Sequence, residues 1–310
     1  MTVAVLMPVR NGGKFLGEAL ESIQRQSLRD IVIVIVDDGS TDDSAAIVSR
    51  HAARDSRIRA MKSGGRGIVD ALNHGLAQSD AGFIARMDSD DVAEPDRLER
   101  QLAAMDANAN LVVLGTAALA IGESAGRVAA MEMETDPARV AALLRHGNPI
   151  LHPSVMMRRA AVERVGGYRR AFTHAEDYDL WLRLSREGEL GNLPQQLMRL
   201  RAHPAQTSAV NRFDQRAAAA LARLRFFGSP LGGENLSTVL LDKAILDYLE
   251  RRHSSGLPIP RAETRDIGLL LRAARRHGGL RVDLRGGMLA LLKANGHSSR
   301  ALRLKLTMRI

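Results

Sequence analysis

Residues 31–40 read Ile-Val-Ile-Val-Ile-Val-Asp-Asp-Gly-Ser, six aliphatic side chains that run into two carboxylates and a turn. Residues 3–9, Val-Ala-Val-Leu-Met-Pro-Val, have the same aliphatic character. Continuous runs of this length are typical of strands that are buried on both faces of a parallel sheet. The two stretches therefore predict neighbouring central strands of an α/β sheet.

Strands and helices alternate along the next hundred residues. The sequence predicts further strands at 58–61, 82–87 and 111–119. Helical patterns lie between them, and the one that runs through Ala53 has Ser40 or Thr41 as its predicted N-cap. This alternation predicts βαβ units, whose right-handed crossovers build an open, mostly parallel sheet with flanking helices.

Polar loops follow three of the predicted strands, at 8–13, 37–40 and 88–91. In an open α/β sheet the ligand lies beyond the carboxyl ends of the strands, so these loops form the predicted site. The first loop lacks the GxGxxG fingerprint, and GxxxxGK[ST] occurs nowhere in the chain. Neither a dinucleotide-dependent dehydrogenase nor a P-loop enzyme is therefore supported.

The positive charge of the chain is concentrated in its last third. The sequence has 44 Lys and Arg against 35 Asp and Glu, a formal net charge of +9. Residues 211–310 hold 19 of the basic and 8 of the acidic side chains, in Ala-, Leu- and Arg-rich helical patterns. We predict an α/β domain over 1–210 and a basic, mainly α-helical region over 211–310. This region fits either an anionic membrane surface or another protein surface, including a second copy.

Composition excludes several other classes of protein. Aromatic residues make up only 3% of the chain and no recognition motif occurs, which argues against a nucleic-acid partner. The absence of cysteine excludes disulfides and thiolate nucleophiles. The first residues do not predict a signal peptide, and no uncharged stretch approaches the roughly 18–20 apolar residues of a bilayer span. We therefore expect a cytoplasmic protein, with peripheral attachment at the inner face of the membrane as the alternative.

Asp88-Ser89-Asp90-Asp91 follows the fourth predicted strand. Carboxylates that are clustered in a partly dry site raise one another's pKa, and a cation between them and an anionic ligand relieves this repulsion. Mn²⁺ or Mg²⁺ fits, because each prefers oxygen ligands and also binds phosphate oxygens. Asp88 and Asp90 therefore predict a metal-bridged diphosphate. For an isolated Asp-x-Asp the alternative is a solvated acidic loop that caps a helix.

Five short motifs share the order and spacing of one enzyme family. They are Pro-Val-Arg-Asn at 8–11, Asp-Asp-Gly-Ser at 37–40, Ala-Arg-Met-Asp-Ser-Asp-Asp at 85–91, His-Pro-Ser-Val at 152–155 and Glu-Asp-Tyr-Asp-Leu-Trp at 176–181. Over roughly residues 1–210 the chain closely resembles the family 2 glycosyltransferases, inverting enzymes with the GT-A fold. The resemblance implies transfer of a sugar from a UDP- or dTDP-sugar to a hydroxyl group of the acceptor. The acceptor is either a glycan or a lipid-linked molecule, and the setting is bacterial surface-polysaccharide or glycolipid assembly.

The resemblance also implies a donor site. Asp38 matches the carboxylate that accepts a hydrogen bond from the nucleobase, a role that suits an ionised carboxylate because it can only accept. Pro8 and Arg10 match the loop that lies against the nucleotide. Asp88 matches the carboxylate near the ribose and the metal, and Asp90 the metal ligand itself.

The resemblance assigns four further residues to the site. Arg86 belongs to the donor-binding set. For Asp91 two roles stay open, a direct role in the site and a favourable negative charge at the start of a helix. His152 matches a segment that borders the acceptor pocket, and His203 matches a late loop that folds over the donor and can reach the metal or the diphosphate. For both histidines, an ordinary hydrogen-bonded structural role is the alternative.

Inversion at the anomeric carbon is a single displacement, which needs one base to deprotonate the attacking hydroxyl. Asp177 matches the Asp of the family's Glu-Asp motif and is the predicted base, with Glu176 as a neighbour that positions the helix. Acidic residues also suit a helix N-terminus, where the dipole favours negative charge. The structural and the catalytic roles are compatible.

Two other functions stay open. A sugar-nucleotide nucleotidyltransferase would need a Gly-rich, Arg-bearing loop after the first strand, and Arg-Asn-Gly-Gly at 10–13 matches that poorly. A non-catalytic module that binds a sugar nucleotide or a glycan would be favoured by the loss of the base. The chain retains Asp177 together with Asp88 and Asp90, which favours the enzyme.

Overall fold

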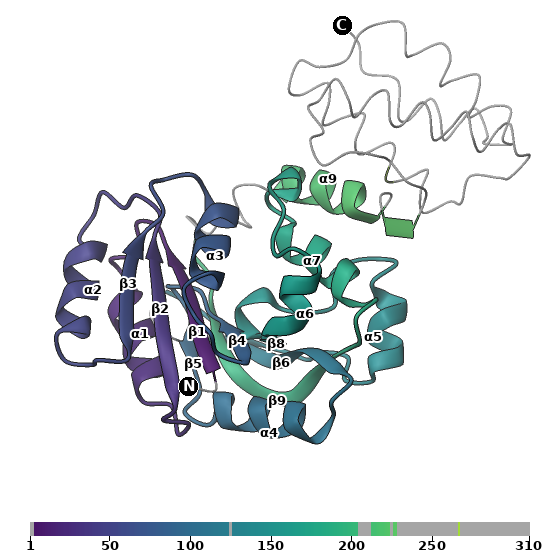
Figure 1. Ribbon diagram of the computed structural model, residues 1–310, viewed down its shortest axis with the longest axis horizontal. Coiled ribbons are helices and arrows are strands. Elements are labelled where there is room, and N and C mark those ends of the chain that lie inside the picture. Colours follow the sequence, from purple (N-terminus) through teal and green to yellow (C-terminus); the bar gives the residue numbers. More distant parts are fainter. Residues whose placement is uncertain (1–2, 124–125, 204–211, 224–225, 228–265, 267–310) are drawn as a thin grey trace, which may run out of the picture. The chain divides into compact units, whose positions relative to one another are not determined.

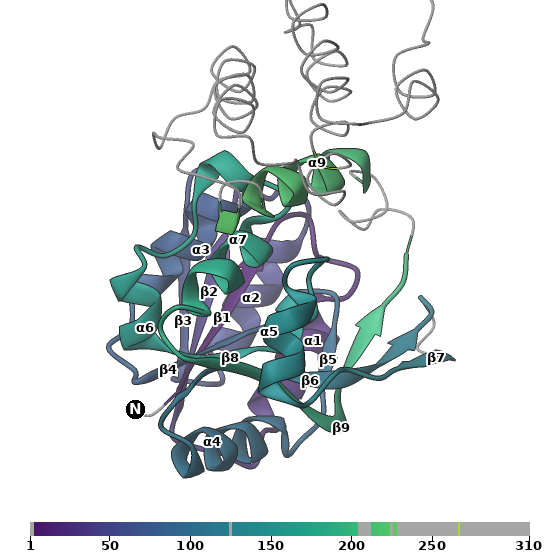
Figure 2. The same cartoon turned by 90° about the vertical axis from the view of Figure 1, so that its right-hand side faces the viewer.

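One mixed sheet organises the N-terminal part of the chain (Figure 1 and, turned by 90°, Figure 2). The computed structural model describes residues 3–123, 126–203, 212–223, 226–227 and 266. Its strands are β1 Val3–Val9, β2 Ile31–Asp37, β3 Ile58–Lys62, β4 Phe83–Arg86, β5 Val92–Ala93, β6 Leu111–Ile121, β7 Arg127–Met131, β8 Met156–Arg158 and β9 Glu189–Arg201. Its helices are α1 Leu16–Gln24, α2 Ser44–Ala52, α3 Ile68–Leu76, α4 Arg97–Ala107, α5 Pro137–Leu143, α6 Arg159–Arg164, α7 Glu176–Leu184 and α9 Arg212–Arg223, with short 3-10 turns η1 His152–Ser154 and η2 Arg170–Phe172.

The sheet has a parallel half and a mixed half. Its strand order is β3-β2-β1-β4-β8-β6-β9-β5, and β7 pairs with β6. The strands β3, β2, β1 and β4 are parallel, whereas β8 runs antiparallel to both β4 and β6. Beyond β6, β9 is parallel to it and β5 antiparallel to β9. The predicted α/β class with flanking helices is confirmed, and the five strands predicted above correspond to β1, β2, β3, β4 and β6.

Both faces of the central strands are buried, as the aliphatic runs predict. Alternate residues of β1 and β2 share one core with α1, α2 and α4. The opposite face of these strands lies under α3, where a Cβ on Gly75 would come within 2.1 Å of Leu6 Cδ1. The missing side chain at Gly75 therefore lets α3 lie directly on the sheet. This packing fixes the carboxyl ends of β1, β2 and β4 relative to one another.

Two local predictions were wrong. The helix expected to start at Ser40 or Thr41 begins at Ser44, because the Ser40 hydroxyl accepts a hydrogen bond from the Asn11 backbone N–H at 3.0 Å. The strand β9 was not predicted at all. Its exposed middle, around Pro194, interrupts the apolar pattern, and its pairing with β6 has several register shifts.

The chain divides into two compact units, Met1–Val210 and Asn211–Ile310. In the second unit the described helix α9 ends at Arg223, whose guanidinium forms a buried ion pair with Asp266 at 2.7 Å. The predicted membrane or oligomer contacts of 211–310 lie largely outside the described residues. Within the described residues, no helix combines the length and the apolar character that crossing a bilayer requires.

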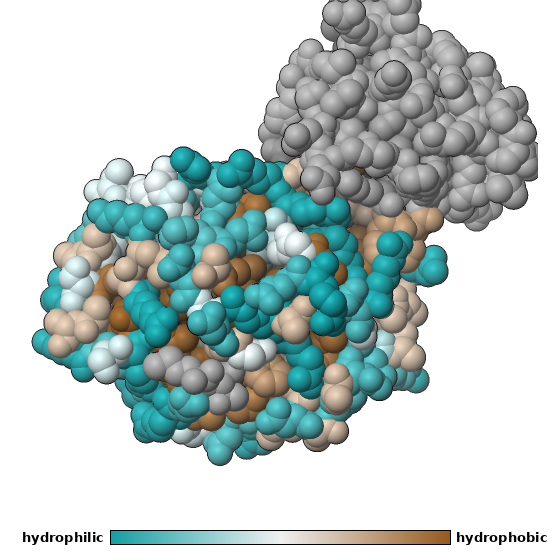
Figure 3. All heavy atoms as spheres, in the orientation of Figure 1, coloured by the Kyte–Doolittle hydropathy of each residue, from teal (hydrophilic) through white to brown (hydrophobic). Residues whose placement is uncertain are grey.

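The surface of the first unit is largely polar where the structure describes it. Figure 3 shows polar side chains over most of one face, with apolar side chains set between them. Among the described residues, Leu143 is the one large hydrophobic side chain classed as exposed, at 42%. The apolar residues of this unit are therefore used almost entirely in its own core.

Candidate active site

The loops after β1, β2 and β4 are tied together at one edge of the sheet. Asn11 Oδ1 accepts a hydrogen bond from the Thr41 backbone N–H at 2.8 Å, and the Asn11 N–H donates to Ser40 Oγ at 3.0 Å. Gly12 lies against the third loop, because a Cβ on it would be 2.9 Å from Ser89 Oγ. The three loops predicted to form the site are therefore brought together by the fold.

Pro8 and Arg10 lie at the end of β1. Pro8 is in register with Val36 of the neighbouring strand β2. The Arg10 side chain is 62% exposed, and its Nη1 lies 3.9 Å from Asp38 Oδ2. An exposed guanidinium beside a carboxylate at this distance is a weak ion pair, so Arg10 is free to approach an anionic ligand.

Asp38 lies directly beneath the loop 63–67. Its Oδ1 accepts from Ser63 Oγ at 2.6 Å, and its Oδ2 accepts from the Gly67 backbone N–H at 2.9 Å. The residue is only 3% exposed. A buried carboxylate with a donor on each oxygen is well satisfied, so Asp38 holds this loop in place. Its role toward a nucleobase stays a prediction.

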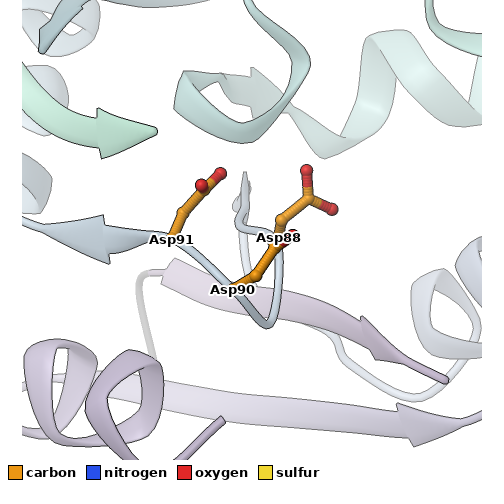
Figure 4. A group of neighbouring side chains, drawn as sticks. All are labelled: Asp88, Asp90 and Asp91. Carbon is orange, nitrogen blue, oxygen red and sulfur yellow. The ribbon is translucent and has the colours of Figure 1, made fainter. Parts of the chain in front are cut away.

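Asp88, Asp90 and Asp91 form a compact carboxylate cluster. One oxygen from each lies within 4.8 Å of the others, and Figure 4 shows Asp88 and Asp91 directed to the same side of the turn. Burial, followed by the charges of Asp88 and Asp90, raises the pKa of Asp91 well above its ordinary value. The Asp91 carboxylate also accepts from the Arg201 backbone N–H at 2.9 Å, which attaches the end of β9 to the cluster.

Arg86 anchors the first carboxylate of the cluster. Its Nη1 donates to Asp88 Oδ2 at 2.6 Å, and its Nη2 contacts Asp88 Oδ1. Arg86 is 3% exposed, and its Nε has no partner among the described residues. Burial raises the pKa of Asp88, and the guanidinium opposes that shift. In the structure Arg86 thus contacts Asp88, and a direct contact with a donor stays a prediction.

His203 reaches the same cluster from the end of β9. Its Nε2 lies 2.8 Å from Asp90 Oδ2, and its ring packs against Phe15 with centroids 5.3 Å apart. The structure therefore brings together Asp90 and His203, which are 113 residues apart in the chain. Clustered carboxylate oxygens with an imidazole nitrogen beside them are a donor set that suits Mn²⁺, and the carboxylates alone suit Mg²⁺.

Glu176 and Asp177 form the first turn of α7, as predicted. The Glu176 side chain is buried, and its Oε2 has no hydrogen-bond partner among the described residues. Burial and the charge of Asp177 raise the pKa of Glu176 to about 7. Asp177 accepts from Asn148 Nδ2 at 2.7 Å and from the Tyr178 backbone N–H at 2.7 Å. Burial raises the pKa of Asp177 as well, so both carboxyls are displaced toward the range in which proton transfer is useful.

His152 lies in the interior rather than on an open surface. Its Nε2 is 2.8 Å from the Tyr168 hydroxyl, and its ring meets Trp181 edge-on with centroids 5.8 Å apart. Burial lowers the pKa of His152 well below its ordinary value, so the imidazole is neutral at physiological pH. These contacts favour the structural alternative for His152.

Sequence reasoning missed three residues that shape the site. Asn148 bonds to the predicted base, Ser63 bonds to Asp38, and the Arg201 backbone bonds to Asp91. The signal for Asn148 was its position four residues before the His-Pro-Ser-Val motif. Ser63 and Arg201 carried no such signal, because each acts through the tertiary approach of a distant strand.

The comparisons with known proteins agree with this geometry. A model of the family described as Glycosyl transferase family 2 matches residues 4–166. EpsE of Bacillus subtilis (strain 168), described as a glycosyltransferase, is 35% identical over 205 residues, which cover 64% of this chain and 72% of EpsE. The O-antigen biosynthesis glycosyltransferase WbnJ of Escherichia coli is 29% identical, over 66% of this chain and 81% of WbnJ. The chain belongs to glycosyl transferase family 2 and is a glycosyltransferase.

Solved structures confirm the GT-A fold. The S. aureus protein TarS 1–349, crystallised in complex with UDP, superposes with a TM-score of 0.61 at 18% identity, over 100% of this chain and 93% of that one. The mannosyltransferase PcManGT of Pyrobaculum calidifontis, in complex with GDP-Man and Mn²⁺, gives a TM-score of 0.55 at 17% identity, over 99% and 88% of the two chains. At these identities the likeness concerns the fold alone.

Proposed function

We propose that the protein is a metal-dependent, inverting glycosyltransferase that moves a sugar from a UDP- or dTDP-sugar to a hydroxyl acceptor. Bacterial surface-polysaccharide or glycolipid assembly is the proposed setting, and the proposed acceptor is a glycan or a lipid-linked molecule. The names of two relatives support this setting: WbnJ, of O-antigen biosynthesis, and AmsE of Erwinia amylovora, of amylovoran biosynthesis. The solved neighbours hold different nucleotides, UDP in TarS and GDP-Man in PcManGT, so the choice of uracil or thymine rests on the match of Asp38 to the family motif.

The carboxylate cluster of Asp88, Asp90 and Asp91 is the observation that carries the proposal. Three acids within 4.8 Å repel one another, and an unrelieved cluster of this kind would be costly in a partly buried place. When bound there, Mn²⁺ or Mg²⁺ would neutralise this charge and stabilise the negative charge that builds on a leaving diphosphate. Asp88 and Asp90 would hold the ion, with His203 beside Asp90, Asp88 oriented by Arg86 and Asp91 tied to β9.

The other end of the reaction belongs to Asp177. A single displacement needs a base on the face opposite the leaving diphosphate, placed to accept the proton of the acceptor hydroxyl. Burial raises the pKa of Asp177 and of Glu176, whose pKa reaches about 7. Glu176 is the carboxyl expected to hold a proton near neutral pH. Asp177 accepts hydrogen bonds from Asn148 and from the Tyr178 N–H, which favour its ionised form, and is the member of the pair that takes the hydroxyl proton.

A thermal-shift screen of nucleotide sugars and nucleoside triphosphates, with and without Mn²⁺, tests this function. We expect a UDP- or dTDP-sugar to raise the melting temperature only when Mn²⁺ or Mg²⁺ is present. A response confined to a nucleoside triphosphate would favour a nucleotidyltransferase. Binding of a sugar nucleotide with no transfer or hydrolysis under any condition would favour a non-catalytic module.

The metal role is tested by Asp90→Ala in calorimetric titrations with the donor found in the screen. We expect the variant to lose the part of the donor affinity that depends on Mn²⁺. Asp80→Ala is the matched control, because Asp80 is an exposed carboxylate in the loop before β4, at the opposite end of the strand. Donor binding by Asp90→Ala that matches the wild type both with and without Mn²⁺ would refute the metal role.

A further inference from the structure

We propose that Asn148 is a positioning residue for the base, whose side-chain amide fixes the Asp177 carboxylate in the orientation that receives the acceptor proton. This inference rests on the proposed function of Asp177. Asn148 Nδ2 donates to Asp177 Oδ2 at 2.7 Å, although the two residues are 29 positions apart. The contact joins the loop between α5 and η1 to the N-terminus of α7.

The orientation of the Asn148 amide follows from its two contacts. Its Oδ1 accepts from the Ile150 backbone N–H at 3.1 Å, while its Nδ2 donates to the carboxylate. A flipped amide would set its oxygen against a carboxylate oxygen and its NH₂ against an N–H donor. Only the observed orientation satisfies both partners, so Asn148 is a committed donor to Asp177.

Asp177 is held at both oxygens. Its Oδ1 accepts from the Tyr178 backbone N–H at 2.7 Å, which fixes the side chain at the start of α7. The Asn148 bond to Oδ2 adds a second restraint from a different element. The Tyr178 hydroxyl also bonds to the Leu144 carbonyl, so the helix and the loop are joined at two points. With both oxygens held, the remaining acceptor positions of Asp177 have fixed directions.

The loop that carries Asn148 is itself anchored in the core. Asn192 of β9 is 3% exposed, and its Nδ2 donates to the carbonyls of Glu134 at 2.8 Å and Pro149 at 3.3 Å. Pro149 and Ile150 are buried, whereas Asn148 is exposed. Asn148 is thus an exposed side chain on a rigid base. That combination is needed to orient a group which must also meet an incoming substrate.

The charges around Asp177 define what the loss of Asn148 should do. The groups that act on it are Glu176 on its own helix, Arg86 from β4 and the phenol of Tyr168. Hydrogen bonding from Asn148 and the charge of Arg86 both lower the pKa of Asp177, against the larger effect of burial. Removing the Asn148 donor therefore raises the pKa of the base, and the fraction of ionised Asp177 falls at a given pH.

Two variants of similar shape separate positioning from folding. Asn148→Leu removes the donor, and Asn148→Asp keeps an acceptor for the Ile150 N–H while it replaces the donor with a carboxylate. The matched control is His146→Ala, an exposed residue in the same loop. The rate is measured as UDP release from a UDP-sugar with Mn²⁺ and water as the acceptor, between about pH 5 and pH 9.

We expect Asn148→Leu to lower kcat about 10- to 100-fold at neutral pH, as fits the loss of one hydrogen bond to a charged group. The acid limb of its pH profile should move to higher pH, and that of Asn148→Asp further still. The KM for the UDP-sugar should stay within about twofold of wild type, because the Asn148 side chain bonds to Asp177 and Ile150 and not to the loops 8–13, 37–40 and 88–91 proposed to bind the donor. His146→Ala should match the wild type in all three quantities.

A wild-type kcat and an unmoved pH profile in both Asn148 variants would overturn the inference, provided that Asp177→Asn is inactive. Activity in Asp177→Asn would instead overturn the proposed base itself, whatever Asn148 does. A fall in kcat with an unmoved acid limb in both variants would also contradict the inference, since it would reflect general damage. Melting temperatures of all four variants show whether each one folds.

Discussion

Asp38 and Glu176 are both buried carboxylates at the site, at 3% and 7% exposure, yet the protein treats them in opposite ways. Asp38 has a hydrogen-bond donor on each oxygen, from Ser63 and from the Gly67 backbone. Glu176 has a buried oxygen without a partner among the described residues, and its pKa is raised to about 7. A buried charge that is fully bonded stabilises a loop, whereas one that is not destabilises the fold.

The difference separates two parts of the site. Around Asp38, the loops after β1, β2 and β3 are held by hydrogen bonds, as suits a preformed pocket for a nucleotide. Around Glu176, the start of α7 keeps acids in a place that raises their pKa, as suits proton transfer. The second region costs stability, which proteins accept at functional sites.

The largest expected effect is that of Asp177→Asn on transfer. A positioned general base contributes about 10²- to 10⁴-fold to the rate, and the amide cannot take the acceptor proton. We expect a fall of that size in the rate of UDP release. Donor affinity measured by calorimetry should stay at the wild-type value. Asp177 is on α7, whereas the loops proposed to bind the donor follow β1, β2 and β4 in the parallel half of the sheet. Undiminished turnover would contradict the assignment of the base.

Glu176→Gln should stabilise the protein at alkaline pH. The pKa of Glu176 rises from 4.5 to about 7 on folding, so between these values the folded state holds a proton that the unfolded chain releases. Stability due to this group is therefore lost as pH rises, and the penalty is complete above about pH 7. Urea unfolding at about pH 8.5 should show a gain of up to about 3 kcal/mol, which disappears toward about pH 4.5. An equal gain at both pH values would contradict this account.

Asp38→Asn should have the opposite sign. The amide can still accept from the Gly67 N–H and donate to Ser63 Oγ, but two hydrogen bonds to a carboxylate are replaced by bonds to a neutral amide, which are about half as strong. We expect a loss of about 1–3 kcal/mol in the free energy of unfolding, measured in the same urea titrations. A neutral or stabilising result would show that Asp38 does not hold the 63–67 loop.

Arg10→Ala should change stability least. Its side chain is 62% exposed, and its Nη1 is 3.9 Å from Asp38, so the ion pair should contribute less than about 0.5 kcal/mol. If Arg10 meets the donor, the KM for a UDP-sugar should rise while the melting temperature stays constant. A melting temperature that falls as far as that of Asp38→Asn would place Arg10 among the residues that hold the loop.

The parallel half of the fold could be predicted from the sequence because its strands are buried on both faces. Continuous aliphatic runs such as 31–36 have few alternatives to a central strand. The mixed half could be predicted only in part. The strand predicted at 111–119 is β6, but β9 is partly exposed and contains Pro194, and β5 is only two residues long. These strands are defined by the pairing of β5 with β9 and of β9 with β6, and the local hydrophobic pattern of a sequence does not predict such long-range pairing.

The site divides along the same line. The motif residues Asp38, Asp88, Asp90 and Asp177 could be selected in advance, since they lie in short motifs whose order and spacing match one enzyme family. Their partners could not. Packing between distant segments decides whether Arg86 contacts the sugar nucleotide or Asp88. It also decides whether His152 lies in a pocket or against Trp181.

The anomeric configuration of the product most directly tests the proposed mechanism, a single displacement at the anomeric carbon with Asp177 as the base. The measurement is the ¹H NMR coupling at the anomeric position of the glycoside formed from an α-linked nucleoside-diphosphate sugar of gluco configuration. One base and one displacement predict a β-linked product. An α-linked product would contradict the account, because retention requires a mechanism other than one attack assisted by Asp177.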